Sequence, residues 1–489
     1  MKLSDLLQGT GLERGPYPDR EVSSLSYDTR TLQPGALYFA LAGYKTDGHL
    51  YIRDALSKGA VAVVCREKPD CDGLFFVAEH PRAILAAASA HWFGHPGDKM
   101  TLVAVTGTNG KTTTTYLLKS ILEQVLRTKV GLIGTNQNMI GGEILPASRT
   151  TPESYELQEL LRKMAEGGCT HVVMEASSHA LVLHRTGTLR FAAGVFTNLT
   201  QDHLDFHQTM EAYRDAKGLL FQQTDVAVLN LDDEAGRFYE KTVPCPVFTY
   251  SENRPQADVT AKNIRLLPTG VAFEAMTQTE LCRVTLPIPG CFSIYNALGA
   301  ISCALVLGLS LGEVAAALTL ASGVRGRAEV VPVPADFAVI IDYAHSPDAL
   351  ENILLTVREF TAGRVIAVFG CGGDRDRAKR PIMGAVAARL ADLSVVTSDN
   401  PRTEHREDII AEILAGMPEE AEVKVELHRR AAIRLALSLA KSGDTVLLCG
   451  KGHETYQEEN GLQNHLDERE EIADYFSTVA AFQGGGAVI

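Results

Sequence analysis

The feature that most constrains the fold is a short apolar run followed at once by a glycine-containing turn and a helical pattern. Residues 102–105 read Leu-Val-Ala-Val, which is typical of a buried strand, and residues 112–126 carry apolar side chains at helical spacing. A strand, a glycine turn and a helix in this order open a doubly wound α/β domain. We therefore expect an α/β fold built on parallel strands.

The turn between that strand and helix indicates phosphate binding. It reads Thr106-Gly107-Thr108-Asn109-Gly110-Lys111-Thr112-Thr113. Its glycines let backbone N–H groups face a phosphate, the lysine can reach the β- and γ-oxygens, and the following threonine can ligate Mg²⁺. Val105 stands where the usual motif has its first glycine, so an ordinary strand-to-helix turn with a chance Lys-Thr is the alternative. The strand–turn–helix context favours ATP or GTP binding.

The length predicts three domains, because 489 residues are about three times the ~150 residues of a typical domain. We expect a small N-terminal α/β domain over 1–98, a central doubly wound domain like the P-loop ATPases over 99–328, and a Rossmann-like domain over 329–489. Strand-like runs support this division, at 36–41, 60–65, 74–77, 171–174, 194–196, 226–229, 338–341, 365–369, 393–396 and 445–449. A helical pattern at 81–93 closes the first segment.

Composition excludes several classes of protein. The 46 Lys and Arg against 60 Asp and Glu give a net charge of -14, the wrong sign for a non-specific nucleic-acid binder. Nine scattered cysteines without a C-x-x-C favour reduced thiols in the cytosol. The N-terminus lacks a signal peptide, and the apolar stretch 297–311 is shorter than the ~18–20 residues of a membrane span. We expect a cytoplasmic monomer without nucleic-acid or membrane partners, with 297–311 a buried helix.

Taken alone, only some of the polar residues indicate chemistry. Glu175 directly follows the apolar run Val-Val-Met, so its charge lies at the end of a strand, and we favour a functional role over a solvated carboxylate. His203 and His207 have zinc-like spacing but no third ligand of that kind. Lys217, by its pattern alone, is a solvated helix lysine. The basic residues Arg375, Arg377, Lys379 and Arg380 favour a solvated face, since Asp374 and Asp376 partly cancel their charge.

An ordered set of motifs resembles the Mur ligases, the ATP-dependent amide-forming enzymes of peptidoglycan synthesis. In chain order these are residues 106–113, 174–179, 197–205, 213–217, 296–298, 326–329, 342–345 and 450–454. The resemblance covers nearly the whole chain and is greatest to the branch of UDP-N-acetylmuramoyl-tripeptide synthetases. Within it, Asp399-Asn400-Pro401-Arg402 resembles the recognition motif of the meso-diaminopimelate-adding enzymes.

The resemblance implies a role for each matched position. The catalytic residues would be Lys111, Glu175, His203 and Lys217. The residues that bind Mg²⁺ would be Thr112, Glu175, His203 and Lys217, with Lys217 carbamylated to N6-carboxylysine. Besides the phosphate loop, the nucleotide would contact Asn296, Arg327 and Asp342, each of which taken singly is more often structural. The uridine end of the UDP-sugar-peptide would contact Tyr27, Thr29, Tyr44, Lys45 and Thr46, and its sugar-peptide end would contact Thr150, Thr151, Ser177 and Arg185. Diaminopimelate would contact Arg375, Asp399, Asn400, Pro401, Arg402, Gly450 and Glu454.

Two positions depart from the family pattern. Thr29 replaces the usual serine and keeps the hydroxyl, whereas Leu183 replaces a frequent glutamine and is left out of the site.

The function that the resemblance implies is ATP-dependent addition of meso-diaminopimelate to UDP-N-acetylmuramoyl-L-alanyl-D-glutamate through an acyl phosphate. A lysine-adding homologue and a folylpolyglutamate synthetase are the alternatives within the same chemistry. The arginine of the Asp-Asn-Pro-Arg motif argues against a lysine-adding enzyme, because its planar fork suits the extra carboxylate that lysine lacks. A nucleotide-binding switch or inactive scaffold is the alternative outside it, but Lys111, Glu175, His203 and Lys217 together would be superfluous in a pure binder.

Overall fold

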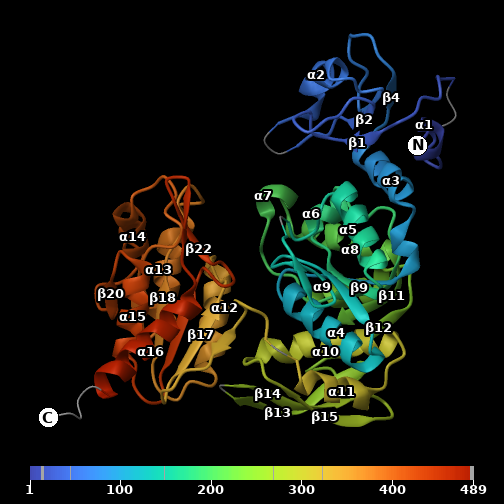
Figure 1. The fold of residues 1–489 in the computed structure, drawn as a ribbon. Coiled ribbons are helices and arrows are strands. Elements are labelled where there is room, and N and C mark those ends of the chain that lie inside the picture. Colours follow the sequence, from blue (N-terminus) through green and yellow to red (C-terminus); the bar gives the residue numbers. More distant parts are fainter. Residues whose placement is uncertain (13–15, 44–45, 148, 268, 322, 485–489) are drawn as a thin grey trace. The chain divides into compact units, whose positions relative to one another are not determined.

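The computed structural model describes residues 1–489 except 13–15, 44–45, 148, 268, 322 and 485–489. The chain forms two compact units. The first contains Met1–Thr260 and Leu298–Ala317, and the second contains Ala261–Ala297 and Leu318–Ile489. Each unit is an α/β structure, so the expected fold class is confirmed (Figure 1).

The first unit begins with a small parallel sheet in the order β1-β2-β3-β4. Its strands are β1 (Ser24–Ser26), β2 (Ala36–Phe39), β3 (Ala62–Cys65) and β4 (Phe75–Val77). Its α-helices are α1 (Leu3–Leu6), α2 (Ile52–Ser57) and α3 (Pro81–Phe93). Alternate side chains of a strand point to opposite faces, so Leu37 and Phe39 enter one hydrophobic core while Tyr38 enters another. Both faces of this sheet are therefore covered.

The larger sheet of the first unit places β5, the strand before the phosphate loop, at its centre. Within this unit the order is β12-β11-β10-β5-β9-β6-β7-β8, and β5 pairs in parallel with both β10 and β9. The strands are β5 (Thr101–Thr106), β6 (Lys129–Ile133), β7 (Asn138–Ile140), β8 (Glu143–Leu145), β9 (Cys169–Glu175), β10 (Phe191–Phe196), β11 (Thr224–Asn230) and β12 (Val247–Ser251). The parallel strands all end at one edge, where a doubly wound sheet binds its ligands.

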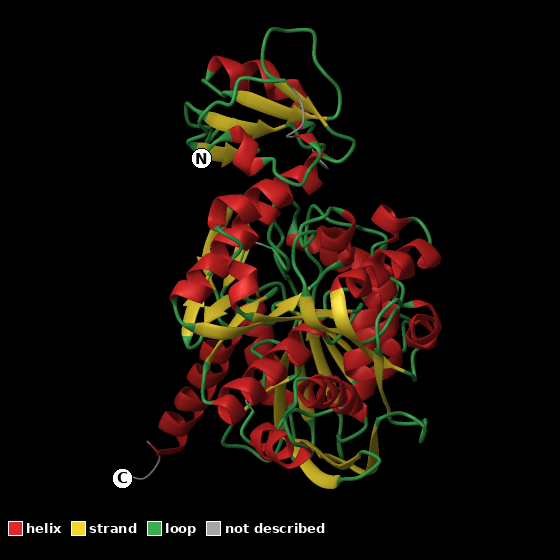
Figure 2. Cartoon of the chain, turned by 90° about the vertical axis from the view of Figure 1, so that its right-hand side faces the viewer, coloured by secondary structure: helices red, strands yellow, loops and turns green. Residues whose placement is uncertain are grey.

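Helices cover this larger sheet and carry several of the residues expected in the site. They are α4 (Lys111–Leu126), α5 (Ser154–Glu166), α6 (Ser178–Val182), α7 (Leu204–His207), α8 (Met210–Gly218) and α9 (Glu234–Thr242). In Figure 2 helices, drawn in red, lie around the strands, drawn in yellow. Helix α3 packs against α5, which ties the small sheet to the larger one within the unit.

Three elements run across the boundary between the units: β13 (Val259–Leu267), α10 (Cys291–Val306) and α11 (Leu311–Thr319). In the second unit β14 (Gly270–Met276) and β15 (Leu281–Leu286) form an antiparallel pair. Helix α10 confirms most of the buried helix expected at 297–311, since Ala297, Leu298 and Ile301 are fully buried. No helix in the described part of the chain is both long and apolar enough to cross a membrane.

The rest of the second unit is a six-stranded sheet in the order β16-β17-β21-β18-β19-β20. Its strands are β16 (Glu329–Val331), β17 (Ala338–Asp342), β18 (Val365–Phe369), β19 (Leu393–Val396), β20 (Val423–Val425) and β21 (Thr445–Cys449). Helices α12 (Pro347–Arg358), α13 (Lys379–Leu390), α14 (Arg406–Leu414), α15 (Arg429–Leu439) and α16 (Glu468–Gly484) pack around it, and β22 (Tyr456–Glu459) and β23 (Leu462–His465) form a separate hairpin. Neighbouring residues of β18 again enter different cores, Val368 on one face and Phe369 on the other.

Candidate active site

The phosphate loop connects β5 to α4 in a conformation that requires glycine. Gly107 and Gly110 have φ of +145° and +83°, and a Cβ at Gly107 would clash with the hydroxyl of Thr197. The Thr197 hydroxyl donates to the backbone carbonyl of Asn109 at 2.6 Å, and the backbone N–H of Asn109 donates to Oδ1 of Asn198 at 2.9 Å. The loop is therefore held against the residues that follow β10, and its shape is preset for an anion.

Lys111 and Lys217 bring two amines to the same carbonyl of this loop. Lys111 Nζ donates to Gly107 O at 2.9 Å and to Thr108 O at 2.8 Å. Lys217 Nζ, from α8, donates to Gly107 O at 2.8 Å and lies 4.3 Å from the centre of the Tyr213 ring. Two lysine amines thus lie beside one phosphate loop, where a charged amine attracts an anion.

The environment of Lys217 contradicts the solvated helix lysine that its local pattern favours. Its side chain is only 1% exposed. Burial, with the nearby Lys111 charge, holds the pKa of the Lys217 amine well below its ordinary value. The local pattern failed here because α8 packs over the loop, and a helix pattern of nine residues does not reveal what covers each face. An amine with this environment is available in its neutral, nucleophilic form.

Glu175, the last residue of β9, lies directly against the start of α4. Its carboxylate is 1% exposed. Oε1 accepts from the hydroxyl of Thr112 at 3.0 Å and from the backbone of Thr135 at 2.9 Å, and Oε2 accepts from the Thr135 hydroxyl at 3.0 Å. Thr135 was not predicted from the sequence, because it follows β6 and only the sheet order brings it to Glu175.

The donor chemistry of this corner suits Mg²⁺. The Thr112 hydroxyl and the Glu175 carboxylate are hard oxygen ligands in contact with each other at the phosphate loop. The described residues contain no group of three or more His, Cys, Asp and Glu side chains able to hold a metal by themselves. Mg²⁺ commonly binds through one or two protein oxygens together with water and substrate phosphates, so the residues present fit it.

The histidines lie beside this corner without forming the zinc site that their spacing suggests. His203 is half-exposed, has φ of +53°, and its Nε2 lies 3.5 Å from Oδ2 of Asp202. Its ring centre is 4.9 Å from that of His179, and partial burial lowers the pKa of His203. His207 instead shares a 2.8 Å hydrogen bond with the Ser178 hydroxyl, and burial lowers its pKa to about 4.

The residues expected to hold the sugar-peptide form a network on the other side of Glu175. Thr151 donates to the Glu175 carbonyl at 2.8 Å and accepts from the backbone of Ser177 at 3.1 Å. Arg185 donates to Thr151 O at 3.0 Å, and the hydroxyl oxygens of Thr135 and Thr150 are within hydrogen-bond distance at 3.0 Å. The structure thus brings all four predicted residues of this set together beside the phosphate loop.

One buried carboxylate near this network was missed by the sequence reasoning. Glu153 is 4% exposed and pairs with Arg185 at 3.4 Å and with Arg82 of α3. The Arg149 guanidinium lies 3.9 Å from the same oxygen. Three arginines around a single carboxylate leave a net positive charge beside Thr151, which suits an anionic substrate.

The predicted uridine-binding residues lie in the small sheet and its connections. Tyr27 donates to Oε1 of Glu156 at 2.6 Å, and burial together with that carboxylate raises the pKa of the Tyr27 phenol. Thr29 is buried, and the Thr46 hydroxyl hydrogen-bonds with the phenol of Tyr51 at 3.1 Å. Tyr44 and Lys45 lie outside the described residues.

Three residues expected to contact the nucleotide belong to the second unit. Asn296 is buried in α10, and the Arg327 guanidinium lies 5.1 Å from the Tyr343 ring centre. Asp342, at the end of β17, accepts from the backbones of Ala328 at 2.7 Å and Ala344 at 2.8 Å. Burial raises the pKa of Asp342. Their grouping with the phosphate loop of the first unit stays a prediction.

The Asp-Asn-Pro-Arg segment follows β19 and forms hydrogen bonds with residues of the second unit that are distant in sequence. Arg402 has φ of +53°, its Nε donates to Oε2 of Glu458 at 3.0 Å, and its Nη1 donates to Gly373 O at 2.9 Å. Arg375 is exposed nearby: a Cβ added at Gly372 would lie 3.0 Å from Arg402 Nη1 and 3.7 Å from Arg375 Cγ. Two guanidinium-bearing side chains therefore flank Gly372.

The other members of the predicted amino-acid site lie beside the same segment. Asn400 Nδ2 donates to Oε2 of Glu454 at 3.0 Å. Asp399 and Pro401 are buried, and Gly450, with φ of +113°, has no room for a side chain because a Cβ there would clash with Oδ2 of Asp399. The structure thus gathers all seven predicted residues of this set in one region of the second unit.

The basic cluster near Arg375 is not the uniformly solvated face that its charge pattern favours. Arg380 is fully buried and donates to both oxygens of Glu404 and to Oε2 of Glu412, each at 2.8–2.9 Å. The Arg380 guanidinium holds the pKa of Glu404 at about 2. Arg375 and Arg377 are exposed as expected. The carboxylate partners come from α14 and the preceding loop, which local sequence does not reveal.

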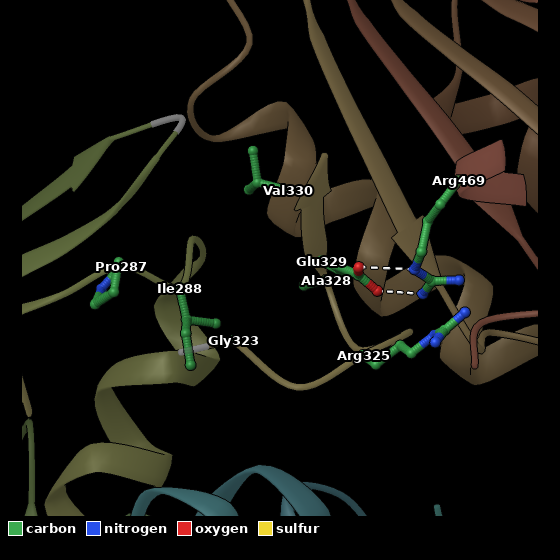
Figure 3. A pocket seen from close by; sticks show the side chains of 8 residues that line it. All are labelled: Pro287, Ile288, Gly323, Arg325, Ala328, Glu329, Val330 and Arg469. Carbon is green, nitrogen blue, oxygen red and sulfur yellow. Dashed lines mark hydrogen bonds and ion pairs between the residues drawn. The ribbon is translucent and has the colours of Figure 1, made fainter. Parts of the chain in front are cut away.

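A cavity of about 380 Å³ lies elsewhere in the second unit. Figure 3 shows Arg469 paired with Glu329 on one wall and Pro287 and Ile288 on the other, with Arg325 below the pair. None of the described residues that were predicted for a substrate site is among those that line it.

The fold and the site define a nucleotide-dependent α/β enzyme with a P-loop-type phosphate site and a separate region built around paired carboxylates and arginines. Comparison with known families agrees with this class. Residues 21–91 match the model of the Mur ligase family catalytic domain, 105–304 the Mur ligase middle domain, and 326–452 the Mur ligase, glutamate ligase domain.

Individual proteins match over nearly their whole length. The UDP-N-acetylmuramoyl-L-alanyl-D-glutamate--2,6-diaminopimelate ligase of Caldanaerobacter subterraneus subsp. tengcongensis is 46% identical, covering 97% of this chain and 98% of its own. A solved structure of a ligase of the same name is 32% identical with a TM-score of 0.70, over 94% of this chain and 95% of that one. The MurF ligase of Thermotoga maritima in complex with ADP shares the fold, at 18% identity and a TM-score of 0.62 over 96% of this chain and all of that one. The chain belongs to the Mur ligase family and is an ATP-dependent acid–amino-acid ligase.

Proposed function

We propose that this chain joins meso-2,6-diaminopimelate to UDP-N-acetylmuramoyl-L-alanyl-D-glutamate at the expense of ATP, a step in peptidoglycan precursor synthesis. Residues 1–98 would capture the UDP end, 99–328 would bind ATP, and 329–489 would deliver the amino acid. The name of the 46% identical relative supports this reaction.

The observation that carries the amino-acid specificity is the held orientation of Arg402. Glu458 accepts from its Nε and Gly373 from its Nη1, which fixes the guanidinium plane. We assign its Nη2 to the second carboxylate of diaminopimelate, with Arg375 as a further cation across Gly372. An arginine fork suits that planar anion, and lysine has no such group to offer.

The central site would hold ATP against the carboxylate of the UDP-linked dipeptide. These two anions repel each other unless cations lie between them, which is the role we give to Lys111 and to Arg185. The carboxylate oxygen attacks the γ-phosphorus, the bond to ADP breaks, and an acyl phosphate forms. The amine of diaminopimelate then attacks the acyl carbon through a tetrahedral intermediate, and phosphate leaves. Thr151 and Ser177 would orient the peptide.

Mg²⁺ would be held by Thr112, Glu175 and His203, and would supply charge neutralisation for the transferred phosphoryl group. Lys217 would contribute after carbamylation. Its neutral amine attacks the carbon of CO₂ and loses one proton, giving a carbamate anion. The burial of Lys217 and the lowered pKa of its amine support this step.

The test measures phosphate release with ATP, the UDP-dipeptide and either diaminopimelate or lysine. We expect release that depends on diaminopimelate, and an Arg402→Ala variant that loses diaminopimelate use while its ATP affinity is unchanged. Arg389→Ala, which removes an exposed arginine paired with Glu351, is the matched control. Release without dependence on any amino acid would contradict the ligase, whereas a preference for lysine would contradict only the specificity.

A further inference from the structure

The Asp-Asn-Pro-Arg segment is anchored by a buried lysine to which the family resemblance gives no role. Lys451, in the loop after β21, has a side chain with 0% exposure. Its Nζ donates to Oδ1 of Asn400 at 2.8 Å and to Oε2 of Glu454 at 2.6 Å, and lies 5.1 Å from the centre of the Tyr456 ring. A fully enclosed ammonium group cannot itself contact a ligand, so any influence on binding must act through these neighbours.

Lys451 decides which way the Asn400 amide faces. Oδ1 of Asn400 accepts from Lys451 and from the backbone of Glu458 at 2.8 Å, whereas Nδ2 donates to Glu454. A cation has no acceptor capacity, so the carbonyl oxygen of the amide must point toward it. Both bonds to Glu454 go to Oε2, so Lys451 and the Asn400 amide hold the same carboxylate oxygen.

The same anchor reaches Arg402 through one more residue. Asn400 holds the backbone of Glu458, the Oε2 of Glu458 accepts from Arg402 Nε at 3.0 Å, and the backbone of Arg402 donates to Glu458 O at 3.0 Å. The hairpin β22–β23 and the Asp-Asn-Pro-Arg segment are therefore one hydrogen-bonded assembly. Of its charged members, Glu454 contacts the buried ammonium group directly, and Glu458 and Arg402 are linked to it through Asn400.

We propose that Lys451 is a positioning residue for diaminopimelate, holding Glu454 directly and Arg402 through Asn400 and Glu458 in the geometry that binds the amino acid. This inference rests on the proposed function. Without the ammonium group, the Asn400 amide loses one of its two donors and is free to turn, and Glu454 keeps a negative charge without its closest cation. The binding geometry would then be populated in only a fraction of the molecules. The apparent dissociation constant for diaminopimelate would rise in inverse proportion to that fraction.

The experiment compares Lys451→Met, which keeps the apolar stem, and Lys451→Arg, which keeps the charge, with the unaltered protein. Initial rates are measured while diaminopimelate, ATP and the UDP-dipeptide are varied in turn. We expect the KM for diaminopimelate to rise roughly 10- to 100-fold in Lys451→Met, the usual consequence of a binding geometry displaced by about 1 Å. The KM for ATP should stay within about twofold, and Lys451→Arg should recover part of the loss.

A matched control and a double variant separate positioning from simple destabilisation. Lys119→Met removes a comparably buried lysine that pairs with Glu123 at 2.7 Å in α4, and it should leave the KM for diaminopimelate unchanged. Glu454→Gln with Lys451→Met removes the carboxylate charge that has lost its lysine partner, so it tests the role even if Lys451→Met alone fails to fold. If the lysine acts through Glu454, the double variant loses less than the product of the two single effects.

The outcomes separate this inference from the proposed function. An unaltered protein without diaminopimelate-dependent phosphate release would overturn both. If that activity is present, any of three results would overturn the positioning role alone. These are an unchanged KM for diaminopimelate in Lys451→Met, an equal rise in the KM for ATP, and fully multiplicative effects in the double variant.

Discussion

The fully buried ion pair between Arg429 and Glu468 allows a sharp prediction about the stability of the second unit. Both side chains are 0% exposed. Arg429 Nε donates to Oε1 of Glu468 at 2.8 Å, and its Nη2 donates to the Cys449 carbonyl at 2.7 Å. An Arg429→Met variant keeps much of the apolar volume but leaves the carboxylate buried without its cation and the carbonyl without a donor.

Breaking one partner of such a pair costs about 3–5 kcal/mol, because the remaining charge has neither water nor a counter-ion. For a unit of roughly 200 residues this corresponds to a fall in Tm of about 6–20 °C. The variant Arg429→Met with Glu468→Gln should be more stable than Arg429→Met alone, since it removes the uncompensated charge.

The loss should also depend on pH. Burial already raises the pKa of Glu468 beside Arg429, and removing that cation raises it further. A carboxyl group with a raised pKa in the folded state is protonated in both states at low pH, so the charge penalty vanishes there. The penalty grows as pH rises above the unfolded pKa and levels off above the folded pKa. The deficit of Arg429→Met should therefore be larger at pH 8 than at pH 5.

Calorimetry of the full chain, resolving the transition of the second unit, measures both effects. The control is Arg434→Met on the same helix: this arginine is 43% exposed, its pair with Glu471 spans 3.4 Å, and its loss should cost at most about 1 kcal/mol. If Arg429→Met shifts Tm no more than Arg434→Met does, or by the same amount at both pH values, the argument from burial is refuted.

Three further predictions concern the two sites and their surroundings. Gly107→Ala should reduce ATP binding at least tenfold in calorimetric titration while the chain stays folded, because the new Cβ clashes with Thr197; undiminished affinity would contradict the loop geometry. Glu404→Gln should lower the stability of the second unit by about 1.5–3 kcal/mol at pH 7 through its lost charged bonds to Arg380. Since the folded pKa of Glu404 is about 2 against an ordinary 4.5, that difference should shrink as pH falls from 4.5 toward 2 in urea melts. Lys217→Met should abolish phosphate release, and in the unaltered protein removing CO₂ and bicarbonate should reduce it reversibly; activity indifferent to both would argue against the carbamate.

Several expectations from the sequence agree closely with the structure because they depend on local pattern. The helix expected at 81–93 and the strands at 365–369, 393–396 and 445–449 have the observed bounds. The antiparallel β14–β15 pair and the β22–β23 hairpin were not predicted. Strand β15 alternates exposed polar and buried apolar residues over its last four positions, and β23 is exposed throughout. Both give a weaker signal than the continuous apolar runs of buried parallel strands.

The candidate site divides in the same way. The glycines of the phosphate loop and Glu175 at the end of β9 could be recognised from the sequence, because a local motif determines the backbone conformation at these positions. Lys217 and Arg380 were read locally as solvated and are buried, while Thr135, Glu458 and Lys451 received no role, although each contacts a predicted site residue. The signal for Lys451 was its place in the matched segment 450–454, but nothing local shows that it is enclosed.

The sequence by itself determined the α/β class, the phosphate loop and the kinds of side chain available for chemistry, because strand pattern, glycine conformation and motif order are properties of neighbouring residues. Only the tertiary structure decided which amines are buried and which carboxylates they meet. A pKa and a hydrogen-bond partner depend on groups that approach from far along the chain: Lys217 meets Gly107 across 110 positions, and Lys451 meets Asn400 across 51. The packing of sheets and hairpins determines these contacts. As a result Lys217 is a candidate for carbamylation and Lys451 a candidate for positioning a substrate site.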